Sequence, residues 1–325
     1  MKKILVVGSL NKDLTIQTNI FPHEGETVTG LKFSQADGGK GANQAVQAAR
    51  LGCSVDIVGK VGHDLFGDSM LNNCNVNNVN TTYLLRNKEP SGVAIIILNE
   101  KEDGNKDNRI IIAPGANNEL TTSDVAFLEK IICDYEYVIL QFEIPMDVNE
   151  YVAKLAHENG VKVVVNPAPS KPMSDIFLKH IDYLIPNEHE FFDVSGENAI
   201  KNEEICEKGI YKGASKLFDK GVNNVIITLG SKGSYFINKD ERFFCKSVKV
   251  NQVIDPTAAG DSFLASFITF LNKGYSHQEA ILIATAVGSL TIQKLGAMPS
   301  LCDTKELRNY IKNLKDRRYK NILIK

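Results

Sequence analysis

A short motif in the last third of the chain has the residue types needed to take a proton from a hydroxyl group. It spans Asp255–Asp261, with the letters DPTAAGD, and a long apolar stretch follows it. Asp261 would lie in the first turn of a helix, where its carboxylate could accept the proton of an attacking hydroxyl. Ala258, Ala259 and Gly260 are small, so their backbone N–H groups could approach a phosphoryl group in transfer. Alternatively, Asp261 only complements the helix dipole, and the motif alone does not separate the two interpretations.

A glycine-rich turn near the N-terminus could bind a second polar group. The segment Gly38–Asn43 holds three glycines and then enters a predicted helix, whose free N–H groups favour a polar or anionic guest. Lys40 adds a positive charge, and Asn43 adds an amide that both donates and accepts hydrogen bonds. The turn is not a Walker-type phosphate loop, because Gly41 follows Lys40 where Ser or Thr is needed. A glycine turn that merely begins a helix is the alternative.

A third candidate follows the predicted strand at 183–185. Asn187 and Glu190 are three residues apart and would therefore lie on one face of a helix. Their oxygens are hard ligands that suit Mg²⁺ or its water shell. The same spacing is that of a helix capping box with Asn187 as the N-cap, so the pair alone supports either interpretation.

Polar residues or glycines also follow other predicted strands. Ligands of open α/β sheets bind beyond the carboxyl ends of the parallel strands. The candidates there are Asn11, Asp13 and Glu143, which could hold sugar hydroxyls, and Thr228, Gly230 and Gly233, which could pack against a base or a phosphate. Each position alone is weak evidence, and the glycine turn could simply lead into the next strand. Their order along the chain is what favours a shared site.

The elements that must position these residues alternate between apolar runs and amphipathic stretches. Strands are predicted at 3–7, 55–59, 137–140, 162–165, 183–185, 224–228 and 234–237. Helices are predicted at 41–51, 65–75, 146–159, 188–194, 211–220, 260–273, 277–293 and 305–316. Apolar runs without alternation indicate strands that are covered on both faces. The pattern therefore predicts an α/β fold with a mostly parallel sheet between helices.

Two regions interrupt this alternation and predict a small second sheet. Strands at 14–18 and 27–35, and a hairpin with strands at 92–98 and 109–113 across a polar tip at 100–108, have no helix between them. We interpret them as a flap over one end of the main sheet, with ordinary edge hairpins as the alternative. The chain has no internal repeat or low-complexity linker, so one domain plus the flap is predicted. The polar stretch 201–212 is predicted to be a surface excursion.

Composition limits the partners that the chain can have. Its 325 residues carry a formal net charge of -2, which gives no basic surface for nucleic acid or for anionic membranes. No stretch approaches the ~20 apolar residues of a membrane span. The six cysteines are scattered without a Cys-x-x-Cys pair, which predicts reduced thiols in the cytoplasm rather than disulfides or a zinc site. We interpret the short apolar run after the N-terminal lysines as a buried strand rather than a signal peptide.

Taken together, these segments resemble the phosphofructokinase-B-type sugar kinase family. The resemblance runs from Val6 to about Ser300, and its most specific parts are Gly38–Gln44 and Asp255–Asp261. It implies a ribokinase-like fold in a single kinase domain over residues 1–325. This fold is a three-layer α/β/α sandwich with a mostly parallel central sheet and a small β-sheet lid, drawn from about residues 12–36 and 91–114. The segments at 8–13 and 22–27 are closer to members that act on D-ribose than to those that act on fructose or adenosine. The implied reaction is therefore ATP-dependent phosphorylation of the primary O5 hydroxyl of D-ribose.

The resemblance assigns a role to each matching position. Asp261 is implied as the general base, with an anion hole at Ala258, Ala259 and Gly260. The sugar would be held by Asn11, Asp13, Gly39, Lys40, Asn43, Glu143 and Asp261, and ATP with Mg²⁺ would be held by Asn187, Glu190, Thr228, Gly230 and Gly233. A monovalent cation, usually K⁺, would lie at Asp255, Thr257, Thr291, Gly296 and Ser300. The resemblance also implies a homodimer in which the two lids pack together.

The chain departs from the family pattern in places. Pro256 stands where a threonine is usual and removes a backbone N–H, which puts K⁺ dependence in doubt. Residues 197–211 and the flap tip at 102–108 are longer than usual, away from the matched positions. Deoxyribose, another sugar or a nucleoside stays open as the substrate. A non-catalytic sugar or nucleotide sensor is the alternative from another class.

Overall fold

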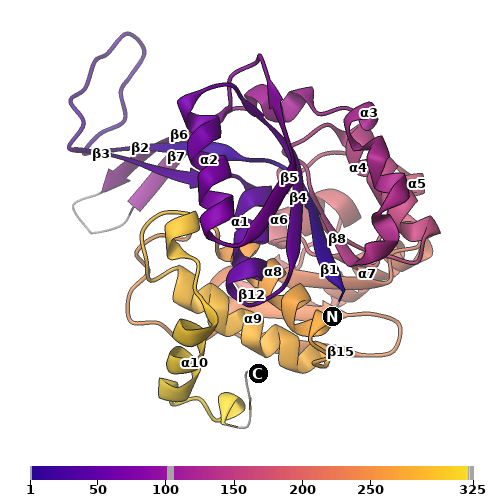
Figure 1. Ribbon diagram of the computed structural model, residues 1–325. Coiled ribbons are helices and arrows are strands. Elements are labelled where there is room, and N and C mark those ends of the chain that lie inside the picture. Colours follow the sequence, from indigo (N-terminus) through magenta and orange to yellow (C-terminus); the bar gives the residue numbers. More distant parts are fainter. Residues whose placement is uncertain (1, 101–105, 321, 323–325) are drawn as a thin grey trace.

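A large sheet lies between two layers of helices, and a smaller sheet projects from one end of the molecule (Figure 1). The computed structural model describes residues 2–100, 106–320 and 322. In spatial order, the nine strands of the large sheet are β15 (Arg242–Lys246), β14 (Gly233–Ile237), β13 (Asn224–Thr228), β10 (Tyr183–Leu184), β9 (Lys162–Asn166), β8 (Tyr135–Gln141), β1 (Lys3–Val7), β4 (Val55–Gly62) and β5 (Val79–Asn87). The strands from β13 to β5 run parallel, whereas β14 and β15 are antiparallel additions at one edge.

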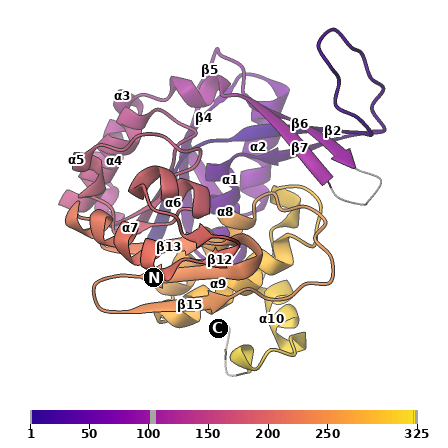
Figure 2. The same cartoon turned by 180° about the vertical axis from the view of Figure 1, so that it is seen from behind.

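Helices cover both faces of this sheet, as Figures 1 and 2 show from opposite sides. One face packs against α1 (Lys40–Arg50), α2 (Leu65–Val76), α8 (Ala259–Asn272), α9 (His277–Thr291) and α10 (Thr304–Asn313). The other face packs against α3 (Thr122–Val125), α4 (Met146–Glu158), α5 (Asp175–Leu178), α6 (Glu188–Ser195) and α7 (Glu207–Asp219). Strand β1 shows how the sequence allows this: Ile4 and Val6 enter the first core, and Leu5 enters the second. The predicted three-layer α/β fold is confirmed.

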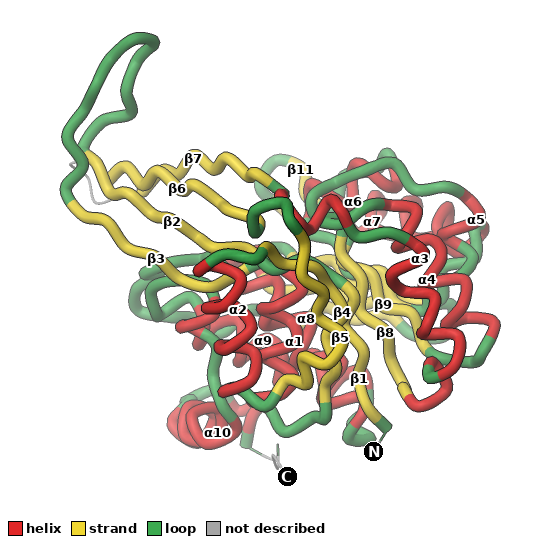
Figure 3. The backbone as a smooth tube through the Cα atoms, turned by 45° about the horizontal axis from the view of Figure 1, so that its top comes forward, coloured by secondary structure: helices red, strands yellow, loops and turns green. Residues whose placement is uncertain are grey.

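The smaller sheet, which we call the lid, leaves the body at one end and extends away from both termini (Figure 3). Its strands are, in order, β3 (Lys32–Gly38), β2 (Asn11–Thr18), β6 (Gly92–Glu100) and β7 (Lys106–Ala113). Strand β2 pairs antiparallel with β3 and parallel with β6, and β6 pairs antiparallel with β7. The predicted hairpin at 92–113 is therefore present, and the part of its tip at 101–105 lies outside the described residues.

Short elements complete the chain. Strands β11 (Ile200–Lys201) and β12 (Glu204–Ile205) form a separate hairpin. The 3-10 helices are η1 (Gly115–Glu119), η2 (Ala126–Lys130), η3 (Ile132–Asp134), η4 (Gly230–Lys232), η5 (Met298–Ser300) and η6 (Arg317–Tyr319). Nowhere in the described parts of the chain is a helix both long and apolar enough to cross a membrane. All six cysteines are free, as their spacing predicts.

Several predicted elements need correction. The lid strand expected at 27–35 begins only at Lys32, where pairing with Gln17 of β2 starts. The polar stretch 201–212 is largely exposed, and β11, β12 and the start of α7 occupy most of it. Helix α7, expected at 211–220, begins at Glu207. Strands β5 and β15 are absent from the sequence prediction. They are the two edges of the large sheet, and their partly exposed residues lack the continuous apolar run of a central strand.

Candidate active site

The two most specific sequence motifs meet at Asp261. This residue lies in the first turn of α8 and is buried, with 7% of its surface exposed. Asn43 Nδ2 donates to Asp261 Oδ2 at 2.9 Å, and Gln44 Nε2 donates to Asp261 Oδ1 at 2.8 Å. Both donors come from the start of α1, 218 and 217 residues away in the sequence. Because each carboxylate oxygen has an amide donor, the group is held in one orientation, as a proton acceptor for a bound hydroxyl must be.

Gln44 is itself held by a second amide. Gln141, at the end of β8, donates from Nε2 to Gln44 Oε1 at 2.8 Å, and both glutamines are fully buried. Gly8 makes room for them, since a Cβ there would lie 1.9 Å from Gln141 Oε1. Neither glutamine is among the site residues predicted from the sequence. The signal available was the position of Gln44 directly after Asn43.

Glu143 connects the start of α1 with the end of β1. Its Oε2 accepts hydrogen bonds from Ser9 Oγ at 2.5 Å and from the Lys40 backbone N–H at 3.1 Å. Asn11 Nδ2 donates to the same oxygen at 3.4 Å, and Asn117 Nδ2 holds Asn11 Oδ1 at 2.8 Å. Ser9 and Asn117 are also missing from the prediction; Asn117 lies in η1, outside every motif.

The glycine turn brings α1 against the segment that follows β1. Gly39 has a φ of +89°, and a Cβ there would lie 2.6 Å from the backbone nitrogen of Asn11. A Cβ at Gly38 would lie 2.4 Å from Asp13 Oδ2. Glycine is therefore required for close approach, as predicted, but the approaching group is the chain's own strand β2. The turn thus sets the positions of Asn11 and Asp13 relative to Lys40.

Carboxylates surround one lysine at the centre of the site. Burial by itself would lower the pKa of Lys40, but the charges of Asp261, Glu143 and Glu190 raise it above its ordinary value. Burial, followed by the charges of Glu143 and Asp261, raises the pKa of Asp13 to about 7. Lys40 therefore remains a cation at neutral pH, whereas Asp13 changes charge there.

A pocket opens between the lid and the body beside Asp13. It is lined by Asp13, Thr15, Ser34, Gln35, Ala36, Ile96 and Leu98 from the lid and by Asp255, Thr257, Leu295, Gly296, Ala297 and Pro299 from the body. Asp261 is not one of the lining residues. A ligand in the pocket would contact the lid sheet on one side and, on the other, the loops of the body at 255–257 and 295–299.

The start of α8 has the backbone geometry to bind an anion. Ala258 is its N-cap and has a φ of +61°, a left-handed conformation that costs a residue with a Cβ roughly 1–2 kcal/mol. A Cβ added at Gly260 would meet no atom of the described residues within 4 Å, so the helix start faces open space there. The first N–H groups of a helix have no partner within it and carry the positive end of its dipole.

The loop before α8 is closed by Asp255. Its Oδ1 accepts from the Thr257 N–H at 2.9 Å, and its Oδ2 accepts from the Gly296 N–H at 2.8 Å. The hydroxyls of Thr291 and Ser300 donate to nearby main-chain carbonyls at 3.0 and 2.6 Å. No group of three or more His, Cys, Asp or Glu side chains within the described residues could hold a metal ion. A cation in this loop would therefore depend on main-chain and hydroxyl oxygens as well as Asp255.

Asn187 and Glu190 form the capping box that their spacing allows. The Asn187 side chain accepts from the N–H groups of His189 and Glu190, and Glu190 Oε2 accepts from the Asn187 N–H at 2.9 Å. Glu190 Oε1 also accepts from Asn187 Nδ2 at 2.9 Å. Burial raises the pKa of Glu190 above its ordinary value, although the Asn187 N–H and the charge of Lys40 oppose this. The pair is thus a helix cap that faces Lys40, and its role toward Mg²⁺ stays a prediction.

The glycine turn after β13 lies next to this cap. Thr228 forms a bridge with Asn187, which places the turn at the same edge of the sheet. Gly230 begins η4 with a φ of +53°, and Gly233 has a φ of +130°. A Cβ at Gly233 would lie 2.0 Å from the carbonyl oxygen of Cys245, so this glycine is required where the turn packs against β15. Contact of the turn with a nucleotide stays a prediction.

Comparison with known proteins agrees with this geometry. The family model described as pfkB family carbohydrate kinase matches residues 1–304. A ribokinase of Lactococcus lactis is 38% identical over 97% of this chain and 98% of its own, and one of Haemophilus influenzae is 37% identical over 96% and 99%. The solved structure of Arabidopsis thaliana ribokinase complexed with ribose and ATP superimposes with a TM-score of 0.85 at 32% identity, covering 96% of this chain and 99% of the other.

Proposed function

Because this chain belongs to the pfkB family of carbohydrate kinases, we propose that it transfers the γ-phosphoryl group of ATP to D-ribose. The observation that carries the proposal is the buried Asp261 carboxylate, held by Asn43 and Gln44 beside the cationic Lys40. Similarity to ribokinases over nearly the whole chain supports ribose as the substrate. The products are D-ribose 5-phosphate and ADP.

In this reaction Asp261 accepts the proton of the O5 hydroxyl as that oxygen attacks the γ-phosphorus. The new O5–P bond forms while the bond from phosphorus to the β,γ-bridging oxygen breaks, and ADP leaves with that oxygen. The N–H groups at Ala258–Gly260, together with the α8 dipole, stabilise the charge on the phosphoryl group. The Ala259 N–H, which donates to the Pro256 carbonyl at 3.2 Å in this structure, would turn to the phosphoryl group. Asn43 and Gln44 keep the carboxylate aimed at the hydroxyl.

The sugar lies between the glycine turn and the lid. We assign its hydroxyls to Asn11, Asp13, Gly39, Lys40, Asn43 and Glu143, most of which the structure brings together through hydrogen bonds or close approach. Carboxylates and amides suit this task, because a carboxylate accepts a hydrogen bond from a sugar hydroxyl and an amide can both donate and accept one. Asp261 joins this set at the reacting hydroxyl.

The nucleotide would lie along Thr228, Gly230 and Gly233, with its phosphates toward Asn187 and Glu190. Mg²⁺ supplies charge neutralisation at the phosphates when bound. Both Glu190 oxygens already accept hydrogens from Asn187, so this pair fits contact with the water shell of Mg²⁺ rather than direct ligation.

A monovalent cation such as K⁺ would lie at the Asp255 loop. The positions are Asp255, Thr257, Thr291, Gly296 and Ser300. Asp255 already spans this loop through Thr257 and Gly296, and the donating hydroxyls of Thr291 and Ser300 keep lone pairs for a cation. The donor set is all oxygen, which fits a hard cation. We infer that the ion shapes the loop before the anion hole.

The chain would act as one kinase domain over residues 1–325, with the lid closing over the sugar to exclude water. Alternation along the strands places Ile16, Phe33, Ile95 and Ile111 on the lid face away from the pocket, and all four are exposed. An apolar face of this kind favours pairing with a second copy. We therefore infer a homodimer through the lids, in the reducing environment of the cytoplasm that free cysteines suit.

The test is ADP release with purified protein across ribose, deoxyribose, fructose and adenosine, with K⁺ exchanged for Na⁺. We expect ribose to give the highest kcat/KM and K⁺ to give a higher rate than Na⁺. Activity only on adenosine would overturn the substrate assignment. No activity on any of the four, with ATP still bound, would favour a non-catalytic sensor.

A further inference from the structure

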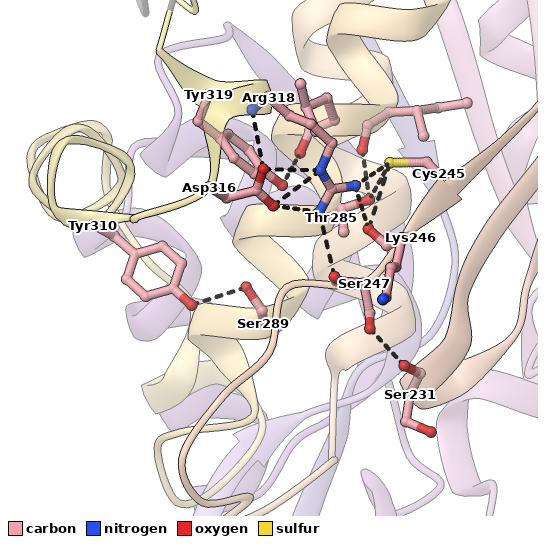
Figure 4. Close-up of polar contacts among 12 residues, drawn as sticks. Ser231, Cys245, Lys246, Ser247, Thr285, Ser289, Tyr310, Asp316, Arg318 and Tyr319 are labelled. Atoms are coloured by element: carbon pink, nitrogen blue, oxygen red, sulfur yellow. Dashed lines mark hydrogen bonds and ion pairs between the residues drawn. The ribbon is translucent and has the colours of Figure 1, made fainter.

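The C-terminal segment follows residue 304, where the family match ends. It packs near the turn at Gly230–Gly233, which we call the nucleotide turn because it is predicted to contact ATP. Figure 4 shows its centre, in which Arg318 of η6 is gripped by Asp316. Arg318 Nε donates to Asp316 Oδ2 at 2.9 Å, and Nη2 donates to the same oxygen at 2.6 Å. Tyr319 is buried and donates from its hydroxyl to the Leu282 carbonyl at 2.9 Å, which fastens the segment to α9.

The remaining donors of Arg318 hold the end of β15. Nη1 donates to the Lys246 carbonyl at 2.6 Å, and Nη2 donates to the Ser247 carbonyl at 3.3 Å. Arginine suits this position because its planar guanidinium can bind a carboxylate and two carbonyls at once, which the single ammonium of lysine cannot reproduce. Arg318 therefore fixes the backbone where the chain leaves the sheet.

Ser247, whose carbonyl Arg318 holds, is in turn hydrogen-bonded to the nucleotide turn. Its Oγ donates to the Ser231 carbonyl at 2.5 Å, as Figure 4 shows, and its N–H donates to the Lys232 carbonyl at 3.1 Å. Close approach of Gly233 to the Cys245 carbonyl adds a third contact between the two segments. Ser231 and Lys232 belong to η4, so each carbonyl held by Ser247 lies in the turn itself.

We propose that Arg318 is a positioning residue for nucleotide binding: through Ser247 it fixes the turn at Gly230–Gly233 against which ATP packs. The proposal rests on the proposed function, in which this turn contacts the nucleotide. Arg318 touches neither the sugar site nor Asp261 in the described contacts, so its effect falls on ATP and not on ribose.

The test compares Arg318→Met with Arg317→Met, a neighbouring exposed arginine, and with Ser247→Ala. We expect Arg318→Met to raise the KM for ATP about fivefold, because the turn loses its fixed position without losing a direct contact with the nucleotide, while kcat and the KM for ribose stay within about twofold. Ser247→Ala should raise the KM for ATP about twofold without lowering the melting temperature, because the Arg318 contacts use main-chain carbonyls. Arg317→Met should behave as wild type. The double variant Arg318→Met/Ser247→Ala should be no worse than Arg318→Met alone, since both act on one path.

Binding of ADP, measured by calorimetry without sugar, separates the possible failures. Wild-type protein that binds no nucleotide would refute the proposed function and this inference together. Wild-type binding with unchanged affinity in both Arg318→Met and Ser247→Ala would refute the inference alone. Equal rises in the KM for ATP and for ribose in Arg318→Met would also refute it, because they indicate general loosening of the fold.

Discussion

Two regions of the site, the surroundings of Asp261 and the lid, differ in how fully contacts within the chain fix and bury their side chains. At the base end, both oxygens of the buried Asp261 accept amide hydrogens from α1, and a further amide backs Gln44. The root of the lid is similarly fixed, since the buried Lys12 and Asp37 form an ion pair at 2.8 Å. The outer lid is not, and Ile16 and Ile111 expose 40% and 64% of their surface. The contrast separates a preformed end around Asp261 from an outer lid whose apolar surface, on the proposed function, would be buried against a second copy.

We expect the largest loss of kcat from a substitution at Asp261, in the region that the chain's own contacts fix. We expect Asp261→Asn to lower kcat by roughly 10²-fold or more, because the amide cannot take the proton of the attacking hydroxyl. Binding of ribose and ATP should be largely retained, since Asn43 and Gln44 still surround an isosteric group. Steady-state kinetics and calorimetry with the same protein check both halves. Near-normal turnover would remove Asp261 from the role of base.

Asp13 lies between the two regions. Its substitution should weaken ribose binding and raise the stability of the sugar-free protein. We expect Asp13→Asn to raise the KM for ribose by roughly 10- to 100-fold through loss of a charged hydrogen-bond acceptor. Because the pKa of Asp13 is raised to about 7 in the folded protein, its stabilising contribution is complete below about pH 4 and is lost as pH rises through 7. Without sugar, Asp13→Asn should therefore melt at a higher temperature than wild type at pH 8, with a smaller difference at pH 5.

Melting temperatures of both proteins between pH 5 and pH 8 decide this point. Asn at position 13 does not titrate, so the difference between the two curves isolates the Asp13 carboxylate. A difference that is constant across the range, or that shrinks toward pH 8, would contradict the assigned direction of the pKa change. Saturating ribose should reduce the difference, since the bound sugar gives the carboxylate its hydrogen-bond partners.

Much of the fold could be predicted from the sequence because its central strands are buried on both faces. In β1, for example, residues 4–7 are all buried and form a continuous apolar run. The edge strands β5 and β15 and the start of β3 could not be located in this way, since their register depends on partners far along the chain. The local pattern of apolar residues therefore predicts that a strand exists, whereas pairing with neighbouring strands decides where the strand begins and ends.

The same division holds within the site. Asp261 and Asn43 belong to motifs that local spacing makes visible, but Gln141 and Asn117 act through contacts that only the folded chain creates. The glycines were expected to approach a ligand, whereas Gly38 and Gly39 make room for β2. A glycine in a sequence indicates close approach without naming the approaching group.

Gln44 offers a sharper test of the preformed end, with Gln47 as a matched control. Both are fully buried on α1, and both donate one amide hydrogen bond, Gln44 to Asp261 and Gln47 to the Cys302 carbonyl at 2.9 Å. We expect Gln44→Met to lower kcat about tenfold with little change in the KM for ribose, because the carboxylate loses one of its two fixed donors. The two variants should lower the melting temperature by similar amounts, but Gln47→Met should leave kcat within about twofold of wild type. Equal losses of kcat in the two variants would mean that Gln44 acts only through the stability of α1.

The smallest effect on turnover is expected at the outer lid, where neighbouring residues on opposite faces separate assembly from catalysis. Ile111 pairs across the strands with Ile95 on the outer face, whereas Ile110 pairs with Ile96, which lines the pocket. Ile111→Asp should convert the dimer into monomers, because a carboxylate would be buried without a partner in the paired lids. The KM for ribose should rise about threefold as the unpaired lid closes less often, with kcat nearly unchanged. Ile110→Asp should leave the dimer intact, so light scattering on the two variants and wild type is the deciding measurement. A wild-type protein that is monomeric at all concentrations, or equal dissociation in both variants, would show that the exposed apolar face of the lid does not hold two copies together.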